Sequence, residues 1–300
     1  PPRSTLFPYT TLFRSNLADA VLENTLLRAE VAGGALKSLK LKSLDWEALS
    51  GPANVIIKED DHGDLWEPYK SLDGGSRIGM TDKHPAPPRA SAVYSDEGPL
   101  EGSQFTTGPV FTEFSFEQPF GQEERLKLTF RLYEGLPRLE CHTELLNNSR
   151  FVRYRAHFPT SISEGTNTQE IPYGAIERPV GVEYPAQNWL DWSDESHGVA
   201  LLNRGLPGNN VADGGLLLSL ARTTAIVAYG FGGGYEPGMS SESGFELGQR
   251  LAFDYALAPH EGGWRDAKLW RQGLEFNNPL IALTAAVHEG PLPAVWGLLK

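Results

Sequence analysis

The sequence predicts an all-β protein, and three observations support this fold class. Apolar and polar residues alternate along many short runs, which is the pattern of strands that bury one face. The 32 glycines and 22 prolines punctuate the chain at short intervals, as many tight turns require. Only one segment has apolar residues at helical spacing. We therefore expect a large antiparallel β-sandwich with one short helix.

The clearest strands lie in the middle of the chain. Residues 126–132, 139–145 and 152–158 each alternate between apolar and polar side chains, and short polar turns separate them. Three such runs predict an antiparallel meander. Residues 111–116 are expected to form one more strand just before the meander.

The remaining elements follow from the same patterns. The helix is expected at residues 264–276, where apolar residues from Trp264 to Leu274 recur at near-helical spacing before an Asn-Asn-Pro stop. Residues 78–101, rich in Pro, Ser, Asp and Lys, predict a long surface loop. Further strands are expected at residues 25–31, 36–41, 54–59, 198–203, 215–221 and 250–258.

Composition excludes several classes of function. A 40 % hydrophobic and 21 % charged chain of 300 residues can bury a sizeable core, and no apolar run approaches the ~18 residues of a membrane span. The net charge of −12 argues against nucleic acid and anionic membranes as partners. The single cysteine, Cys141, shares a strand face with Leu139 and Leu145, which predicts a buried structural thiol. A reducing compartment such as the cytoplasm is expected, and an exported protein without disulfides is the alternative.

The two ends differ in character from the rest of the chain. Residues 1–15 have no capping or periodic pattern and resemble a translated adaptor or vector scar, so we set them aside. The chain stops on the apolar residues 296–299 with no terminating signal. We therefore expect residues 16–300 to be one β-sandwich domain of a longer protein, truncated at its C-terminus.

Residues 59–69 are the first of four stretches whose residues suggest chemistry. The acidic residues and His62 are types that bind metals, but they lack a recognised ligand spacing, which favours a solvated turn. Asp64 and Trp66 suggest a sugar site, because a pyranose ring offers an apolar face to an indole and hydroxyls to a carboxylate. A buried core role for Trp66 is an equal alternative.

Two further stretches also suggest carbohydrate recognition. Glu177 and Arg178, flanked by Gly and Pro, place fixed donors beside a carboxylate, which can grip hydroxyls or orient a catalytic acid. An ordinary ion pair at a sheet edge is the alternative. In residues 187–194, alternation places Trp189 and Asp191 on one face of a strand, close to amide side chains.

The last stretch, residues 203–210 followed by the glycine-rich residues 229–238, lacks the Lys-Ser/Thr of a phosphate loop and predicts tight turns. The chain has no G-x-S-x-G motif and no H-E-x-x-H motif. Many carboxylates are present, but their spacing selects no pair for glycoside hydrolysis.

Several of these motifs occur together, in one order, in a known family. Residues 171–179 resemble the motif I-P-[FY]-G-x-I-E-R-P, and residues 185–203 resemble P-A-Q-x-W-x-D-x-S-D…G-[VL]-A-L-L-N. Residues 60–69 resemble a G-D-L-W-E-P stretch, and residues 255–260 with 276–280 resemble a closing signature. The chain in this respect resembles the C-terminal β region of the retaining α-mannosidases of glycoside hydrolase family 38, in their bacterial branch.

The resemblance covers nearly everything from Asn24 to Pro293 and implies a function. It implies a galactose-mutarotase-like supersandwich, and double displacement on the α-mannosides of a mannose-containing oligosaccharide. In the family, an N-terminal α/β domain that is absent here carries the aspartate nucleophile and the zinc ion. This chain is therefore expected to hold no catalytic residue and no metal, to be inactive alone, and to have that missing domain as its partner.

The resemblance also implies that this β region forms the rim of the active site. Arg178 matches an arginine that lies near the catalytic pocket in the family, and Trp66 or its neighbours fall near a substrate-lining aromatic residue. We predict six substrate-binding residues at the rim: Arg178, Glu177, Trp66, Asp64, Trp189 and Asp191.

Two alternative functions stay open at this point. The chain could be a non-catalytic carbohydrate-binding or structural module of a larger enzyme. Less favoured is a mutarotase-like sugar epimerase, which needs a His and a Glu on the concave face of its sheet. His142 and His157 both lie in predicted strands, so composition alone leaves this alternative standing.

Overall fold

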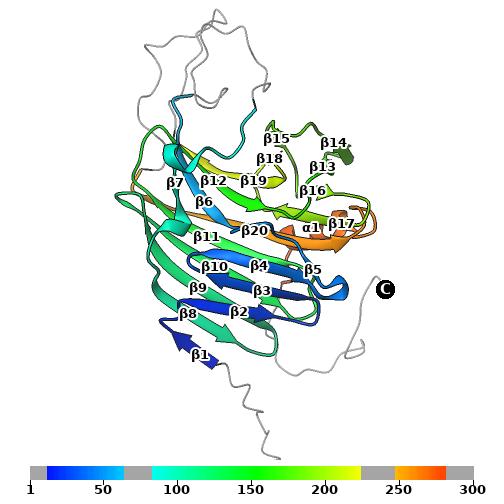
Figure 1. Ribbon diagram of the computed structural model, residues 1–300, viewed down its shortest axis with the longest axis horizontal. Coiled ribbons are helices and arrows are strands. Elements are labelled where there is room, and N and C mark those ends of the chain that lie inside the picture. The colour runs from blue at the N-terminus through cyan, green and yellow to red at the C-terminus, as the bar shows by residue number, and fades with distance from the viewer. Residues whose placement is uncertain (1–11, 64–82, 224–246, 282–300) are drawn as a thin grey trace, which may run out of the picture.

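The computed structural model describes residues 12–63, 83–223 and 247–281, and these residues confirm the predicted fold class. Three antiparallel sheets of ten, six and four strands make up almost all of the ordered secondary structure, together with one α-helix in the described ranges (Figure 1). No helix of the described residues is long and apolar enough to cross a bilayer.

The ten-stranded sheet is the larger layer. Its order is β1-β8-β9-β10-β11-β20-β17-β16-β13-β14. Its strands are β1 (Leu12–Ser15), β8 (Glu101–Thr107), β9 (Phe111–Phe120), β10 (Glu124–Tyr133), β11 (Leu139–Asn147), β13 (Thr166–Ile171), β14 (Gly174–Glu177), β16 (Trp189–Ser193), β17 (His197–Asn203) and β20 (Gln249–Glu261). β1 includes residues that the sequence analysis had set aside, and it lies on the edge of β8.

Two smaller sheets form the opposing layer. The six-stranded sheet has the order β15-β18-β19-β12-β6-β7, and the four-stranded sheet runs β2-β3-β4-β5. The six strands are β6 (Val55–Asp60), β7 (Val93–Tyr94), β12 (Val152–Pro159), β15 (Tyr184–Pro185), β18 (Gly208–Ala212) and β19 (Gly215–Arg222). The four are β2 (Asp19–Glu23), β3 (Leu27–Ala32), β4 (Ala35–Leu41) and β5 (Trp46–Glu47).

The predicted meander is right for β10 and β11 but wrong for β12. β9, β10 and β11 pair in sequence order. The second edge of β11 is taken by β20, from Leu139↔Leu257 to Asn147↔Gln249, so no edge is left for the next strand. The chain instead turns at Phe151, whose φ is 55°, and β12 crosses to the six-stranded sheet between β6 and β19.

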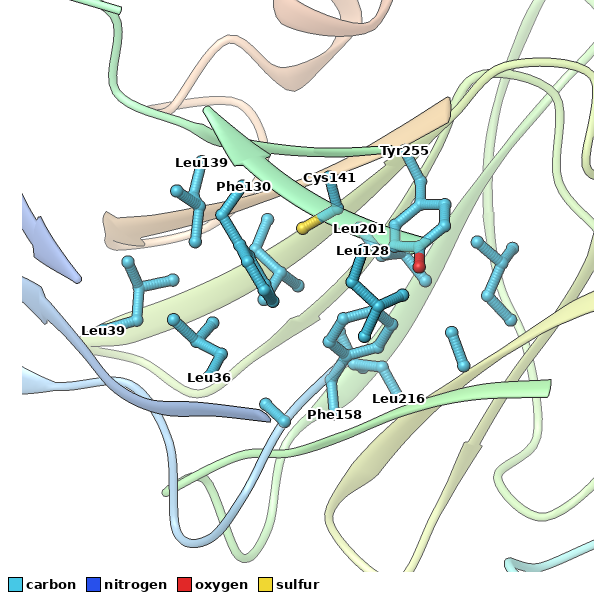
Figure 2. Packing of buried hydrophobic residues seen from close by; sticks show 14 of the residues in the cluster. Leu36, Leu39, Leu128, Phe130, Leu139, Cys141, Phe158, Leu201, Leu216 and Tyr255 are labelled. Atoms are coloured by element: carbon cyan, nitrogen blue, oxygen red, sulfur yellow. The ribbon is translucent and has the colours of Figure 1, made fainter. Parts of the chain in front are cut away.

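The main core fills the space between the two layers (Figure 2). Leu128, Phe130 and Tyr255 of the ten-stranded sheet face Leu36 of the four-stranded sheet and Phe158 of the six-stranded sheet. The Tyr255 hydroxyl also lies 2.6 Å from Asn54 Oδ1, so a hydrogen bond ties the layers together inside the core.

The single cysteine behaves as predicted. Cys141 on β11 is 2 % exposed and packs in the main core. Burial raises the pKa of its thiol far above the ordinary value, because the thiolate would lose its hydration there. A neutral, inert packing thiol is the result, which agrees with the sequence analysis.

The one predicted helix is found, but it is shorter than expected. α1 (Leu269–Asn277) begins after Lys268, whose φ of 52° is left-handed, and turns occupy residues 264–267. Its buried residues Leu269 and Phe276 pack on the outer side of β16 and β17, in a second small cluster with Trp189. The helix therefore covers one end of the ten-stranded sheet from outside.

The expected loop at residues 78–101 is described from residue 83 onward. It holds two 3-10 turns (Arg89–Ser91 and Ser95–Glu97) and the short strand β7; a third 3-10 turn, Lys42–Leu44, follows β4. It is not purely a surface loop, because His84, Tyr94 and Ser95 are buried against the six-stranded sheet. Residues 83–86 in particular lie over the outer face of that sheet.

Candidate functional site

Arg178 lies at the open end of the sandwich. β14 is the last strand of the ten-stranded sheet and β15 is the last strand of the six-stranded sheet, and residues 178–183 connect them. The backbone N–H of Arg178 donates to Asn167 O at 2.8 Å, which continues the edge of the sheet by one residue. The residue therefore sits where the chain passes from one layer to the other.

The guanidinium of Arg178 is held by a ring and not by a carboxylate. Its Cζ lies 4.8 Å from the centre of the Tyr184 ring, a cation–π contact that fixes the plane of the group. Its Nε is buried and has no hydrogen-bond partner within the described residues. An arginine in this state has donors to offer to an oxygen-rich ligand, such as a sugar hydroxyl or a carboxylate.

The neighbouring Glu177 is exposed on the edge strand β14. Adjacent strand residues point to opposite faces, and the described residues contain no ion pair between Glu177 and Arg178. The alternative of a simple edge ion pair therefore lacks support. Asp64, Trp66 and the glycine-rich residues 229–238 lie outside the described residues.

Trp189 and Asp191 share a face as predicted, but that face is buried. Trp189 is 1 % exposed and packs against Trp264 with ring centres 5.3 Å apart and ring planes tilted by 34°, beneath α1. Asp191 is fully buried and accepts hydrogen bonds from Ser193 Oγ (2.8 Å) and His260 Nε2 (2.9 Å). Neither side chain presents a surface to a sugar in this chain, so the geometry assigns them to packing. The physical reason is that the short helix covers Trp189, while Ser193 and His260 occupy the Asp191 carboxylate.

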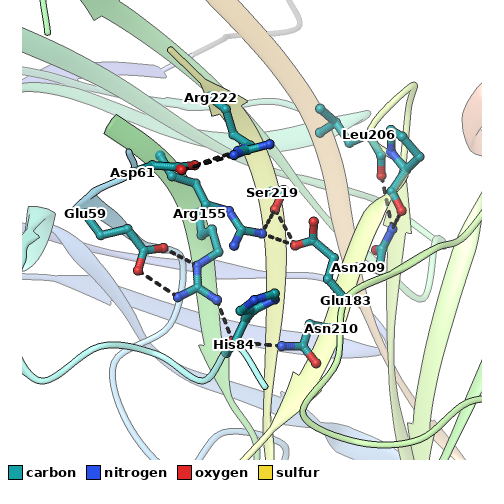
Figure 3. A network of polar contacts seen from close by, with 12 residues as sticks. Glu59, Asp61, His84, Arg155, Glu183, Leu206, Asn209, Asn210, Ser219 and Arg222 are labelled. Atoms are coloured by element: carbon teal, nitrogen blue, oxygen red, sulfur yellow. Dashed lines mark hydrogen bonds and ion pairs between the residues drawn. The ribbon is translucent and has the colours of Figure 1, made fainter. Parts of the chain in front are cut away.

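The most unusual cluster of the structure is one that the sequence analysis did not find. On the outer face of the six-stranded sheet, ionised side chains form a buried polar layer (Figure 3). We use the name polar layer for Glu59, Asp61, Arg153, Arg155, Glu183, Ser219 and Arg222.

Arg155 of β12 is at the centre of the polar layer. It is fully buried and binds Glu59 of β6 with two hydrogen bonds, Nε to Oε1 at 2.5 Å and Nη2 to Oε2 at 3.1 Å. The remaining donors reach the carbonyls of His84 and Pro85, both at 2.8 Å. Full pairing of this kind is what allows an arginine to be desolvated.

Two further ion pairs extend the polar layer to either side. The guanidinium of Arg153, also fully buried, binds the Glu183 carboxylate and donates to Ser219 Oγ at 2.6 Å. Arg222 of β19 binds Asp61 through Nε (2.6 Å) and Nη2 (3.1 Å). Glu59 and Asp61, two of the residues that suggested a metal at residues 59–62, are thus engaged with arginines.

Comparison with known proteins decides which family this architecture belongs to. A family model described as glycosyl hydrolases family 38 C-terminal domain matches residues 22–226, which is more than half of the chain. The chain belongs to glycoside hydrolase family 38. The motif-based resemblance is thereby confirmed.

The curated relatives of this family 38 chain are longer than the chain itself. It is 27% identical over 311 residues to alpha-mannosidase 2C1 of Homo sapiens and 27% identical over 303 residues to that of Mus musculus. These alignments cover 98% and 96% of the chain but only 27% and 26% of the relatives. The chain thus spans about a quarter of the length of the curated relatives it matches.

Two kinds of solved structure are similar to this family 38 chain. An alpha-mannosidase from Enterococcus faecalis V583 aligns with a TM-score of 0.72 at 17% identity, over 94% of this chain and 33% of that one. That likeness supports the shared fold. A galactose mutarotase-like protein from Lactobacillus casei also aligns, with a TM-score of 0.44 and 12% identity over 81% of this chain and all of that one.

The zinc ion that the motif resemblance implies has no ligand set in the part of the chain that the structure describes. Across residues 12–63, 83–223 and 247–281, no group of three or more His, Cys, Asp or Glu side chains is arranged to hold a metal. His62, the candidate ligand, stacks on Phe151 with ring centres 5.6 Å apart. These residues do not fit a zinc site, and no catalytic step through the metal follows from them.

The two histidines considered for an epimerase lie on different sheets. His142 is on the outer face of β11, with Nδ1 2.8 Å from Asp254 Oδ1, in a groove of about 400 Å³. His157 is on β12, where burial and the nearby Arg155 lower its pKa to about 4. The sandwich separates the two histidines, so no single site contains both.

Proposed function

We propose that this chain is the C-terminal β part of a retaining α-mannosidase that removes terminal α-mannose residues from glycans or oligosaccharides. Membership of family 38 and the similarity to the two mammalian alpha-mannosidases support this substrate class. Because the chain spans about a quarter of those relatives, the proposal concerns the whole parent enzyme, and the chain alone is expected to be inactive.

We infer that Arg178 is the residue through which this part reaches the active site, as a member of its rim. The observation that carries this inference is the state of its guanidinium: stacked on Tyr184, with Nε buried and without a hydrogen-bond partner among described residues. A buried donor without a partner costs free energy, so a ligand or another domain that accepts a hydrogen bond from it would stabilise this arrangement.

The division of labour follows from the same proposal. The aspartate nucleophile and the zinc ion of the family belong to the part of the parent outside this chain, where zinc would bind the sugar hydroxyls. Glu177 and Arg178 would grip a substrate hydroxyl or orient a carboxylate at the rim. The single buried cysteine fits a reducing compartment, so we propose the cytoplasm as the location.

The test is hydrolysis of p-nitrophenyl α-mannoside, with added zinc, by the full-length parent and its Arg178→Ala variant. Loss of one charge-assisted contact predicts a decrease of kcat/KM of about 10- to 100-fold. Arg204→Ala is the matched control, because Arg204 also lies over a ring, that of Phe276 at 4.5 Å, but far from β14. Equal activity of Arg178→Ala and the parent would refute the rim assignment, and an inert parent would refute the mannosidase.

A further inference from the structure

The polar layer connects β12 to the chain segment that carries Arg178. β12 places Arg153 and Arg155 on the outer face of the six-stranded sheet, while Tyr154 and Ala156 point into the main core. Each of the two arginines holds a different covering segment on that face. Both segments lead to the surroundings of Arg178.

Hydrogen bonds from Arg155, which we call the Arg155 arm, hold residues 83–86 in place. Arg155 donates to the carbonyls of His84 and Pro85, and Asn210 Nδ2 donates to the same His84 carbonyl at 2.9 Å. The His84 N–H in turn donates to Gly181 O at 2.8 Å. This chain of hydrogen bonds ends three residues after Arg178.

The contacts of Arg153, which we call the Arg153 arm, hold the residue next to Tyr184, the residue whose ring lies against Arg178. Arg153 and Ser219 Oγ both donate to the Glu183 carboxylate, Ser219 at 2.6 Å. Glu183 directly precedes Tyr184, the residue on which the Arg178 guanidinium lies. The approach is close: a Cβ on Gly208 would stand 2.9 Å from Ser219 Cβ and 3.0 Å from Glu183 Oε1. Space for the carboxylate therefore depends on a glycine.

We propose that Arg153 and Arg155 are positioning residues that hold residues 178–184, and with them the Arg178 guanidinium, in register at the rim. The proposal rests on the proposed function of Arg178 and extends it to residues that touch no substrate. A scaffold needs such support, because a displacement of about 1 Å at a binding group can cost up to ~100-fold in rate.

The test uses paired apolar replacements in the full-length parent. Arg155→Met/Glu59→Leu and Arg153→Met/Glu183→Leu remove each arm without leaving a buried charge unpaired, so folding is expected to be retained. Thermal unfolding checks that expectation. We expect kcat/KM for p-nitrophenyl α-mannoside to fall about tenfold in each double variant.

A matched control pair joins β6 of the six-stranded sheet to β10 of the ten-stranded sheet. Lys58 and Glu124 form a buried pair at 2.6 Å, with 15% and 1% side-chain exposure, and Lys58 also binds Ser149 Oγ at 2.7 Å, away from β14. Lys58→Met/Glu124→Leu removes a largely buried pair whose contacts join β6 to β10 and Ser149, and not to residues 178–184. Its kcat/KM should stay within about twofold of the parent, since distant sites are nearly independent.

The decisive readout is coupling to Arg178→Ala. If the arms act through Arg178, adding either paired replacement to Arg178→Ala lowers kcat/KM no further. Additive losses, or paired variants as active as the control, would overturn the positioning role while leaving the proposed function intact. An effect of the paired variants with a harmless Arg178→Ala would instead refute the rim assignment on which the proposal rests.

Discussion

The outer faces of the two larger sheets carry the same types of residue in opposite states. On the six-stranded sheet, Arg155 and Glu59 are 0% and 6% exposed and the covering segments seal them from water. On the ten-stranded sheet, Arg131 and Glu113 pair across β10 and β9 with 40% and 20% exposure. The alternation that produces both pairs in the sequence is identical.

The difference shows that burial, and not pairing, decides what an ion pair does. An exposed pair exchanges hydration for a contact of nearly equal strength, so it adds little to stability. A buried pair has already lost its hydration, so each partner depends on the other. The ion pairs of the polar layer must therefore stay intact for the fold to be stable, whereas the pairs on the ten-stranded sheet belong to a solvated surface.

Removing one partner of the buried Arg155–Glu59 pair should give the largest loss of stability. Arg155→Ala leaves the Glu59 carboxylate and two backbone carbonyls without their donor, which should lower the free energy of unfolding by about 3–5 kcal/mol. Denaturant unfolding of the 300-residue chain measures this. A loss below about 1 kcal/mol would show that water replaces the guanidinium and that the polar layer is not sealed.

His157, on the covered outer face of the six-stranded sheet, should make the stability of the fold depend on pH. Its folded pKa, lowered to about 4 from 6.5, means that the unfolded chain binds the proton more readily between these values. Stability should thus be complete above about pH 6.5 and fall, by on the order of 2–3 kcal/mol, as the pH drops to 4. Unfolding curves of the chain and of His157→Gln across that range measure the difference. An unchanged slope in the variant would contradict the prediction.

A substitution on the exposed outer face of the ten-stranded sheet should give the smallest loss of stability. Arg131→Ala removes a 2.6 Å hydrogen bond to Glu113 and a contact with the Phe111 ring, yet should cost only about 0.2–1 kcal/mol. The same denaturant unfolding measures it. A cost close to that of Arg155→Ala would erase the contrast between the faces.

The sequence predicts where the strands lie better than it predicts which strands pair with each other. Alternation locates the strands that bury one face, including β10, β11 and β20, because period two is a direct consequence of strand geometry. It cannot tell that β20 takes the edge of β11 and sends β12 to the other layer. Pairing partners more than 100 residues apart leave no local pattern.

The candidate site was predictable to a lesser degree. The motif that contains Arg178 points to the strand β14, next to the proposed rim residue, but Trp189 and Asp191 in the next motif are buried, Trp189 beneath α1. The polar layer was missed because Arg153 and Arg155 alternate with Tyr154 and Ala156, as solvated residues do. Only the segments that cover this face, which come from residues 83–86 and 181–185, make it an interior.

The place of β20 in the ten-stranded sheet also has a consequence for how the chain folds. β20 is the sole link between the half from β1 to β11 and the half from β13 to β17, and it is the last strand of the described residues to be synthesised. The β9–β10 and β16–β17 hairpins are local and can form early. The two halves must wait for residues 249–261, so closure of long loops comes late and sets the pace.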